Sequence, residues 1–278
     1  MTDEMCSRFA AFGDAVVEES GDILRDMLGN VRSLSKGRFD VVTEADYAVE
    51  RRFAERLSRE FPDHQMVAEE GIEQNECSTQ GFCWVLDPLD GTVNYAVGVP
   101  LFAVSLALLH DGQPQLAWVL DVCSGELFRA RRGGGATLGD RPLEAKPPEG
   151  GVFLLGASSG FIGWLLSKGD VSPLEEILRH FGKIRIYGSQ ALQLCYVASG
   201  RLLANVSREA KLWDDAAGAL IATECGRRYT GLSGNSVFPL KEDSPLWRGH
   251  GIGSVAGEAN AHQKLLDLLE PIIRQTGS

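Results

Sequence analysis

The sequence predicts an α/β fold, a layered sandwich of helices and sheets, and three observations support this prediction. Helix-like and strand-like segments alternate in the second half of the chain, which is typical of sheets covered by helices. In the middle, apolar segments follow one another across short polar connections, which is typical of antiparallel strands. The chain has 278 residues, 44% of them hydrophobic, enough for one large domain or two closely packed subdomains.

The first half is expected to begin with two helices and to continue as a sheet. Apolar residues recur at helical spacing over residues 3–30, and a second helix opens at Thr43 and ends near Glu60. A polar loop at residues 35–38 separates the two helices. Short apolar runs predict strands at residues 66–68, 82–86, 101–110, 114–121 and 126–131, before a turn at Gly139-Asp140.

The second half is expected to alternate strands with helices. The predicted strands are residues 152–157, 184–187 and 201–206. The predicted helices are residues 173–181, 189–199, 214–225 and 258–270. The proline- and glycine-rich stretch Lys146–Gly151 is the best boundary, so we expect an N-terminal α+β subdomain, 1–150, and a C-terminal α/β subdomain, 151–278.

Charge and composition exclude several classes of partner. The net charge of -11 disfavours nucleic acid, because the phosphate backbone is held mainly by Lys and Arg. A small anionic substrate remains compatible if carboxylates first gather cations. Asp3 and Glu4 disfavour a signal peptide, and the longest apolar runs are far shorter than a membrane span, so we expect a cytoplasmic protein without a membrane partner.

Cysteine and histidine spacing predicts free thiols and no zinc site. The six cysteines form no C-x-x-C pair, and a chain of this length does not need disulfides. The five histidines are dispersed and have no metal-ligand spacing.

The stretch Asp87-Pro88-Leu89-Asp90 places two acids at the end of an apolar strand. One Asp could cap a helix that begins near Thr92. Two carboxylates ~4 Å apart, however, repel by roughly 4 kcal/mol at an effective dielectric of 20. We therefore expect a cation between them.

Two further acidic pairs stand at similar junctions. Glu69-Glu70 follows a short apolar run, and Asp214-Asp215 opens a predicted helix. Each pair alone is ordinary, as a solvated loop or as acids in the first turn of a helix. Together, three such junctions predict oxygen ligands gathered around hard divalent cations such as Mg²⁺.

Residues beside the acids are suited to bind phosphate and water. Glycine at position 91 lets a bound group approach the backbone, and the N–H groups that open a helix favour anions. The Thr92 hydroxyl could hold a water. Thr43 and Asp46 have capping-box spacing, which explains them structurally, and they also fit such a site.

Together these stretches resemble the inositol monophosphatase superfamily of metal-dependent, often lithium-sensitive sugar phosphatases. The family's D-P-[IL]-D-G-T-x-N signature matches residues 87–94, and its W-D-x-A-A-G signature with a following E-x-G matches residues 213–218 and 224–226. Its G-E-E corresponds to residues 68–70, with Ala68 in place of glycine, and its T-x-x-D to residues 43–46. These anchors come in the family's order and cover about residues 40–230.

The resemblance implies a fold and a reaction. The fold would be a layered α-β-α-β-α sandwich of the sugar phosphatase type, assembled as a homodimer. The reaction would be Mg²⁺-dependent attack of water on a small phosphate monoester, with two or three ions per site and Mn²⁺ able to replace Mg²⁺.

The resemblance also assigns residues to roles. The implied metal ligands are Glu69, Asp87, Asp90, Asp214 and the carbonyl of Leu89. The implied catalytic residues are Asp46, Thr92 and Glu69, of which Asp46 and Thr92 orient or activate the attacking water. The amides of Gly91 and Thr92 would bind the phosphate.

The substrate pocket departs from the family pattern. Gly188-Ser189-Gln190-Ala191 matches the pocket-lining G-[ST]-x-A, although Ser189 alone would be a helix N-cap. Ser207 stands where inositol phosphatases usually carry an acid, and Arg208 and Lys211 lie near it, so Ser207 and Arg208 join the substrate-binding candidates. The substrate could be an inositol monophosphate or a related sugar or nucleotide phosphate. The alternatives are a 3'(2'),5'-bisphosphate nucleotidase or a fructose-1,6-bisphosphatase, unless Arg208 and Lys211 point into solvent.

Of three other interpretations, the serine hydrolase and the non-catalytic homologue stay open at this point. Gly156–Gly160 is a literal G-x-S-x-G, the serine-hydrolase elbow, with Ser158 as nucleophile and His250 downstream, although no clear helix is predicted after it. Gly133–Gly139 lacks the spacing of a nucleotide loop and is expected to connect strands. A non-catalytic regulatory homologue would keep the metal site without activity.

Overall fold

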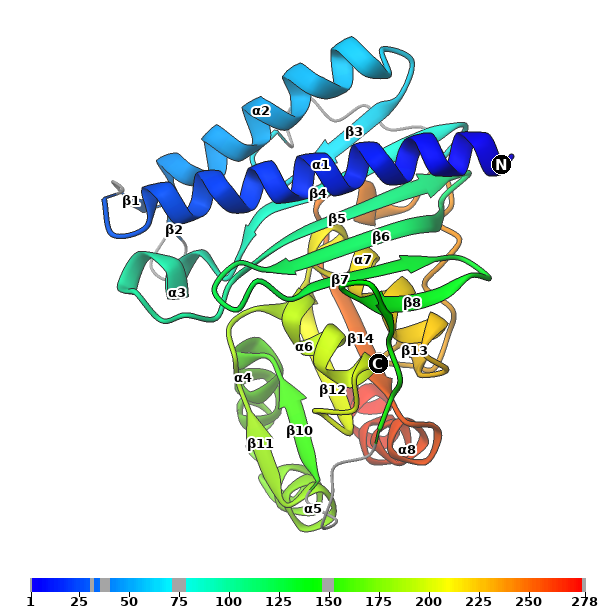
Figure 1. The fold of residues 1–278 in the computed structure, drawn as a ribbon. Coiled ribbons are helices and arrows are strands. Elements are labelled where there is room, and N and C mark those ends of the chain that lie inside the picture. The colour runs from blue at the N-terminus through cyan, green and yellow to red at the C-terminus, as the bar shows by residue number, and fades with distance from the viewer. Residues whose placement is uncertain (1, 31–32, 36–40, 72–78, 147–152, 277–278) are drawn as a thin grey trace.

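The computed structural model describes residues 2–30, 33–35, 41–71, 79–146 and 153–276, which form two mixed sheets, a two-stranded hairpin and three layers of helices (Figure 1). The layers stack in the order α-β-α-β-α, which confirms the predicted layered sandwich. The loop predicted at residues 35–38 includes Lys36–Arg38, which lie outside the described residues.

The larger sheet has the strand order β3-β4-β5-β6-β7-β8-β9, in which β3 and β4 are parallel and the other pairs are antiparallel. It confirms the strands predicted for the middle of the chain. Its strands are β3 (Gln65–Ala68), β4 (Phe82–Asp90), β5 (Ala103–His110), β6 (Gln113–Asp121), β7 (Leu127–Arg131), β8 (Gly135–Leu138) and β9 (Arg141–Pro142).

The glycine-rich segment Gly133–Gly139 is only partly the connecting loop that was predicted. Gly133 and Gly135 have φ of 70° and 82°, which side chains rarely allow, so the turn is tight. The residues from Gly135 to Leu138 are therefore free to pair with β7 as strand β8.

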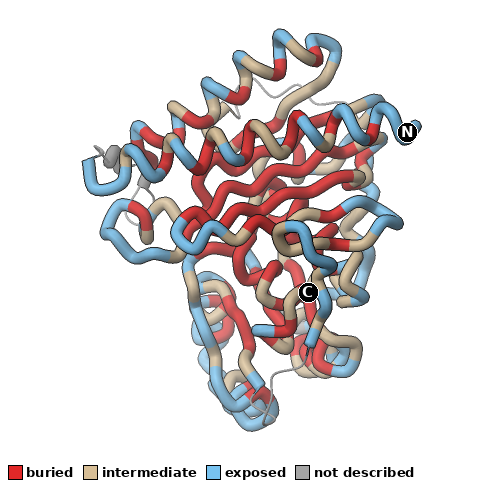
Figure 2. The backbone as a smooth tube through the Cα atoms, in the orientation of Figure 1, coloured by how far each residue is buried: buried red, intermediate tan, exposed pale blue. Residues whose placement is uncertain are grey.

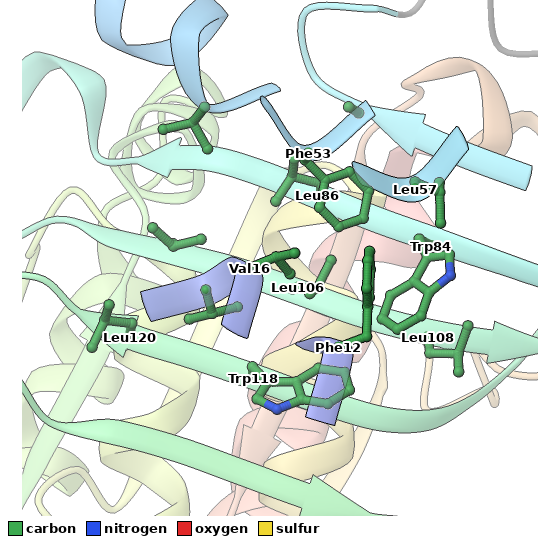
Figure 3. Packing of buried hydrophobic residues seen from close by; sticks show 14 of the residues in the cluster. Phe12, Val16, Phe53, Leu57, Trp84, Leu86, Leu106, Leu108, Trp118 and Leu120 are labelled. Carbon is green, nitrogen blue, oxygen red and sulfur yellow. The ribbon is translucent and has the colours of Figure 1, made fainter. Parts of the chain in front are cut away.

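Helices α1 (Asp3–Met27) and α2 (Glu44–Glu60) cover one face of this sheet. The apolar side of α1 packs Phe12 and Val16 against aromatic side chains of the sheet, among them Trp84 and Trp118 (Figure 3). Trp84 is fully buried. This packing explains why the helical spacing of apolar residues predicted α1 and α2 correctly.

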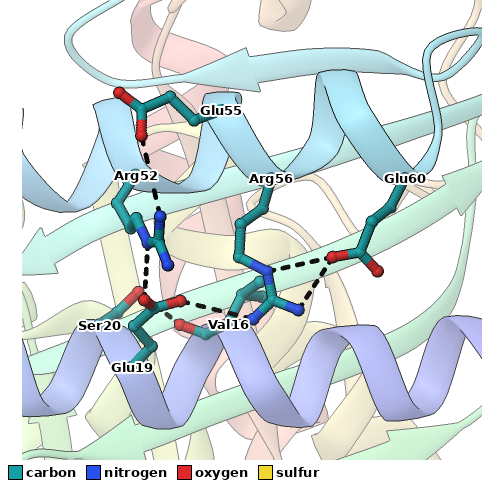
Figure 4. A network of polar contacts seen from close by, with 7 residues as sticks. All are labelled: Val16, Glu19, Ser20, Arg52, Glu55, Arg56 and Glu60. Carbon is teal, nitrogen blue, oxygen red and sulfur yellow. Dashed lines mark hydrogen bonds and ion pairs between the residues drawn. The ribbon is translucent and has the colours of Figure 1, made fainter.

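Ion pairs lie between α1 and α2 (Figure 4). Glu19 of α1 accepts from Arg52 Nε of α2 at 2.6 Å and from Arg56 Nη1 at 3.4 Å, and within α2 Glu60 accepts from Arg56 Nη2 at 2.9 Å. Such partly exposed pairs contribute little stability, about 0–1 kcal/mol each. The apolar core is therefore the main contact that holds the two helices together.

Side chains alternate between the two faces of the larger sheet, and those on the second face point toward a central layer of helices. Trp84 and Leu86 face α1 and α2, whereas Cys83 and Val85 pack against the helices between the two sheets. These are α6 (Gln190–Ala198) and α7 (Leu212–Glu224), which are buried along most of their length (Figure 2).

The smaller sheet has the order β11-β10-β12-β14-β13. Helices α4 (Ser159–Ser167), α5 (Ser172–Phe181) and α8 (Ala259–Thr276) pack on its outer face. Its strands are β10 (Leu154–Ala157), β11 (Lys183–Arg185), β12 (Ala204–Ala210), β13 (Arg228–Gly231) and β14 (Ile252–Gly257).

Short elements complete the described chain. They are the hairpin β1 (Ser33–Ser35) and β2 (Val41–Thr43), helix α3 (Thr92–Val97) and the 3-10 helix η3 (Pro245–Arg248). Among the described helices, none is both long and apolar enough to span a bilayer.

Candidate functional site

Strand β4 directs Asp87 toward the start of α7. Asp87 follows Cys83 and Val85 in the alternation that faces the central helices. It pairs with Ser105 on β5, whose hydroxyl donates to the carbonyl of Trp213 at 3.0 Å, one residue before Asp214. The Asp87 carboxylate is 1% exposed, and its Oδ1 accepts from the Leu89 amide at 2.9 Å.

A break in the strand register turns Asp90 toward α6. Asp87 pairs with Ser105 but Asp90 pairs with Ala103, so one extra residue is accommodated around Pro88, where a proline can supply no ladder hydrogen bond. The Asp90 carboxylate accepts three hydrogen bonds from the start of α6. They come from the Ser189 hydroxyl at 2.6 Å, the Ala191 amide at 2.6 Å and the Gln190 amide at 3.2 Å.

Asp214 is the third acid of the site and lies in the first turn of α7. Its Oδ2 accepts from the Lys211 amide at 2.7 Å, so it also caps that helix. Its side chain is hydrogen-bonded to that of Asp87. Residues 127 positions apart in sequence thus meet through side chains, because β4 ends where α7 begins.

Burial and mutual repulsion disfavour the charged form of these acids. Burial, with the Glu69, Asp90 and Asp214 charges, raises the pKa of Asp87 well above its usual range. Burial raises the pKa of Asp90 to about 6, against the hydrogen bonds from Ser189, Ala191 and Gln190 that lower it. Burial and the charge of Asp90 raise the pKa of Asp214 to about 8.

The donor chemistry of this cluster fits a hard divalent cation. The potential ligand atoms of Asp87, Asp90 and Asp214 are carboxylate oxygens, and no contact described above pairs them with a cation. A divalent cation would reduce the repulsion among the three carboxylates. Within the described ranges, no three His, Cys, Asp or Glu side chains are already arranged to hold an ion. An ion at this cluster would first have to separate the hydrogen-bonded pair Asp87 and Asp214.

The two acids after β3 lie at the same edge of the sheet, because β3 runs parallel to β4. The charge of Glu69 is the largest electrostatic contribution that raises the pKa of Asp87, so Glu69 lies near it. Glu70 instead donates its backbone amide to Glu50 at 3.0 Å. Glu50 matches no motif in the sequence, and from α2 it accepts this hydrogen bond at the turn after β3.

Asp46 and Thr92 meet at a second polar group. Asp46 is fully buried, and its Oδ2 accepts from the Thr43 amide at 2.8 Å and hydroxyl at 2.6 Å, which is the predicted capping box. The Thr92 hydroxyl lies 3.3 Å from Asp46 Oδ1 and 2.9 Å from the Leu89 carbonyl. Burial raises the pKa of Asp46.

Two glycines let the Gly91 turn and the loop before α6 approach closely. Gly91 has φ of 96°, and a Cβ there would lie 2.9 Å from the Leu101 carbonyl and 3.3 Å from that of Gly188. Asn94 joins the two loops by donating to the carbonyls of Leu101 and Tyr187, both at 2.7 Å. Gly91 and Gly188 are therefore neighbours, as two substrate-binding candidates should be.

The two substrate candidates on β12, Ser207 and Arg208, lie in different surroundings. Ser207 is 1% exposed and lies two residues after Asn205, whose side-chain amide donates to Gln190 on α6. Arg208 is exposed and lies over the ring of Trp164, with its Cζ 5.1 Å from the ring centroid. It lines a cavity of about 690 Å³ that includes none of the carboxylates described above, so no described contact brings Arg208 to them.

Several polar residues at the site carry no role in the sequence prediction. Asp215, Gln193, Asn205 and Tyr229 form a buried network behind α6. The doubled acid in Trp213-Asp214-Asp215 was the available signal, but only one of its two acids matches the family motif.

Ser158 is an N-cap residue in the structure. The prediction that no clear helix follows it is wrong, because α4 begins at Ser159. Ser158 has an ordinary extended φ of -83°, however, and not the strained turn of a nucleophile elbow. Its hydroxyl donates to Glu209 Oε2 at 2.7 Å and accepts from the Phe161 amide at 3.1 Å, which is a structural role.

Comparison with known proteins gives a consistent result. The model of the "Inositol monophosphatase family" matches residues 6–274. The chain is 30% identical to an inositol-1-monophosphatase of Bacillus subtilis, covering 82% of this chain and 83% of that protein. It is 35% identical to the Nus factor SuhB of Pseudomonas aeruginosa, with 84% and 83% covered. The Thermotoga maritima IMPase structure superposes with a TM-score of 0.79 at 25% identity, over 96% of this chain and 99% of that one.

Proposed function

The chain belongs to the inositol monophosphatase family, whose members hydrolyse phosphate monoesters, and we propose that it does so with Mg²⁺ on a small sugar-type phosphate. The observation that carries the proposal is the convergence of Asp87, Asp90 and Asp214, whose pKa values are all raised. Glu69 and the Leu89 carbonyl would complete an all-oxygen ligand set, the kind that Mg²⁺ prefers. The proposal includes two or three ions per site and Mn²⁺ as a substitute.

Different residues of the chain would then bind the metal, orient the attacking water and accept its proton. When bound, Mg²⁺ would supply positive charge for the phosphate and make water nucleophilic near neutral pH. Asp46 and Thr92 would orient the attacking water, since the Thr92 hydroxyl and Asp46 Oδ1 face each other at 3.3 Å. A raised pKa suits Asp46 as a carboxylate that takes up a proton. Glu69, beside Asp87, is the third catalytic candidate.

The loops at Gly91 and Gly188 would hold the phosphate and the rest of the substrate. The amides of Gly91 and Thr92 would face the phosphate, because the positive φ of Gly91 leaves the backbone open to close approach. Gly188, Ser189, Gln190 and Ser207 would line the pocket around the alcohol portion. These assignments follow the family resemblance and the nearness of the two loops.

A monophosphate substrate fits better than a bisphosphate. The bisphosphate nucleotidase and fructose-1,6-bisphosphatase alternatives depend on Arg208 and Lys211 for a second anionic group. The Arg208 guanidinium instead lies over Trp164. Inositol monophosphate or a related sugar phosphate is therefore the first substrate to test.

The test is phosphate release from four compounds, each with Mg²⁺ and with EDTA. They are inositol 1-phosphate, fructose 1,6-bisphosphate, histidinol phosphate and adenosine 3',5'-bisphosphate. We expect Mg²⁺-dependent release, inhibition by Li⁺, and a loss of at least ~100-fold in Asp90→Asn with the circular dichroism spectrum unchanged. Asp26→Asn, at an exposed position on α1, is the control and should keep full activity.

Two outcomes would count against the proposal. Release that persists in EDTA would exclude the metal mechanism. No release from any of the four compounds would favour the non-catalytic, regulatory interpretation.

The proposal extends to assembly and location. Val93, Val97 and Val99 are 50%, 69% and 39% exposed on and just after α3, beside the site, which supports a homodimer interface there. We treat residues 1–150 and 151–278 as two closely packed subdomains, each contributing one sheet. Five described cysteines are free thiols, which supports a reducing, cytoplasmic location.

A further inference from the structure

A buried polar network lies behind the carboxylate cluster, and apart from Gln190 its residues have no part in the roles assigned above. Its centre is Asp215, which is fully buried in the first turn of α7. Asp215 Oδ1 accepts from Gln190 Nε2 at 2.7 Å, and Oδ2 accepts from the Tyr229 hydroxyl at 2.7 Å. The carboxylate therefore links α7 to α6 and to β13, the edge strand of the smaller sheet.

The network fixes which way the Gln190 amide points. Its Nε2 must face the Asp215 carboxylate, because a carboxylate only accepts. Its Oε1 then faces two donors, Asn205 Nδ2 at 3.1 Å and Gln193 Nε2 at 3.2 Å. Each of these three amide side chains is at most 8% exposed, so reversing one would leave buried donors facing donors or buried acceptors facing acceptors.

The backbone of Gln190 connects this network to the proposed metal site. Its amide donates to Asp90 Oδ1 at 3.2 Å, between the donors from Ser189 and Ala191. The orientation of Asp90 therefore depends on the first turn of α6. Gln193 extends the effect, since its Oε1 accepts from the amide of Tyr187, in the loop that carries Gly188.

Apolar packing sets the distance between α6 and α7. Gly218 of α7 lies against Leu194 in the middle of α6, where a Cβ would come within 2.6 Å. In the first turn of α6, Ala191 and Leu192 are buried in the apolar core, and the side chains of Gln190 and Gln193 add polar contacts. Loss of the network would remove these polar contacts while leaving the two helices packed.

We propose that Asp215, supported by Tyr229, is a positioning residue that orients Asp90 for metal binding through Gln190. The inference rests on the proposed function, since it takes Asp90 as a ligand. Residues that orient metal ligands typically contribute 10- to 100-fold to metal affinity or activity. The same range is expected for Asp215, even though its carboxylate does not touch the ion.

The experiment measures Mn²⁺ binding directly, by electron paramagnetic resonance titration of the purified full chain, together with the melting temperature. Asp215→Ala should weaken Mn²⁺ binding by about 10- to 100-fold, and Tyr229→Phe, which removes a single donor to Asp215, by less. The control is Thr230→Val, on the same strand, which removes a 2.9 Å contact with His262 away from the network. The control should lower the melting temperature without changing Mn²⁺ affinity.

A conservative variant separates positioning from simple loss of structure. Asp215→Asn keeps an oxygen that accepts from Gln190 Nε2, and its amide can donate to the Tyr229 hydroxyl, which accepts as well as donates. Asp215→Asn should therefore retain most of the Mn²⁺ affinity that Asp215→Ala loses.

The outcomes distinguish the two proposals. Wild type that binds no Mn²⁺ would refute the proposed function and the inference with it. Wild-type binding with Asp215→Ala unchanged, or with Asp215→Asn as weak as Asp215→Ala, would overturn the positioning role alone.

Discussion

At the residue scale, the protein keeps carboxylates where burial and like charges disfavour ionisation. The end of β4 and the start of α7 bring Asp87, Asp90 and Asp214 together. Burial and repulsion make their charged forms unfavourable, which raises their pKa values. Helix capping alone does not account for three carboxylates that converge at one place. A cation site does account for them, because a cation is bound by several oxygen ligands.

The stability of the metal-free protein should therefore fall as the pH rises. The pKa of Asp90 is about 6 and that of Asp214 about 8 in the folded chain, against an ordinary value of 3.8. Between the ordinary and the raised pKa, the folded state binds more protons than the unfolded state, so the free energy of unfolding decreases with pH. Melting temperatures in EDTA should decrease from pH 6 to pH 8.

Two comparisons check the cause of that pH dependence. Mg²⁺ should restore stability most at pH 8; at 100 times its dissociation constant the gain is about 2.7 kcal/mol. Asp87→Asn should flatten the pH dependence, because it removes the charge that faces the other acids. A melting temperature in EDTA that is constant or rising over this range would contradict the assignment.

Sequence indicated the residues of the proposed site but not the network behind them. Asp87, Asp90 and Asp214 were singled out because paired acids beside apolar segments are unusual and, together with Thr92, match a motif. Gln190 was a substrate candidate, but its contact with Asp215 joins residues 25 positions apart, on two helices whose relative placement no local pattern encodes.

At the element scale, α1 can pack closely on the larger sheet because Gly13 leaves room for the Trp118 ring. A Cβ on Gly13 would lie 2.2 Å from Trp118 Cζ2, an atom of a buried ring. Gly13→Ala should therefore destabilise the protein by about 1–3 kcal/mol, less the ~1 kcal/mol that alanine gains in a helix. The free energy of unfolding from urea titration measures this.

Gly163 provides the matched control on α4. It is exposed, and a Cβ there would meet nothing within 4 Å. Gly163→Ala should stabilise the protein by about 0.5–1 kcal/mol, since only helix propensity changes. Equal effects of the two substitutions would show that α1 does not pack on Trp118 as described.

The elements that sequence predicted well are those with strong periodicity. Helices α1 and α2 and strands β4 to β7 have clear apolar patterns and were found within a few residues, although β4 runs on through Pro88 to Asp90. Strands that the sequence did not predict include β8, β13 and β14, which are short or contain glycines, and tertiary pairing stabilises them. Helix α8 was expected to end near residue 270 but continues through Pro271 to Thr276.

At the scale of the whole molecule, the central helices α6 and α7 pack between the two sheets. The proposed dimer interface would include the exposed side of α3. Val97→Asp, at a side chain 69% exposed, should convert a dimer to a monomer in light scattering, because it buries a charge in an apolar contact. Met5→Asp, 36% exposed near the start of α1, is the control. It lies far from α3 along that helix and should leave the mass unchanged (Figure 1).

The central claim is that segments distant in sequence converge to share divalent cations. Its most direct test is a crystal of the full chain grown with Mn²⁺ and measured for anomalous scattering. We predict anomalous peaks bounded by Asp87, Asp90 and Asp214, with Asp87 and Asp214 no longer hydrogen-bonded to each other. Crystals with saturating Mn²⁺ and no peak among these three carboxylates would contradict the account.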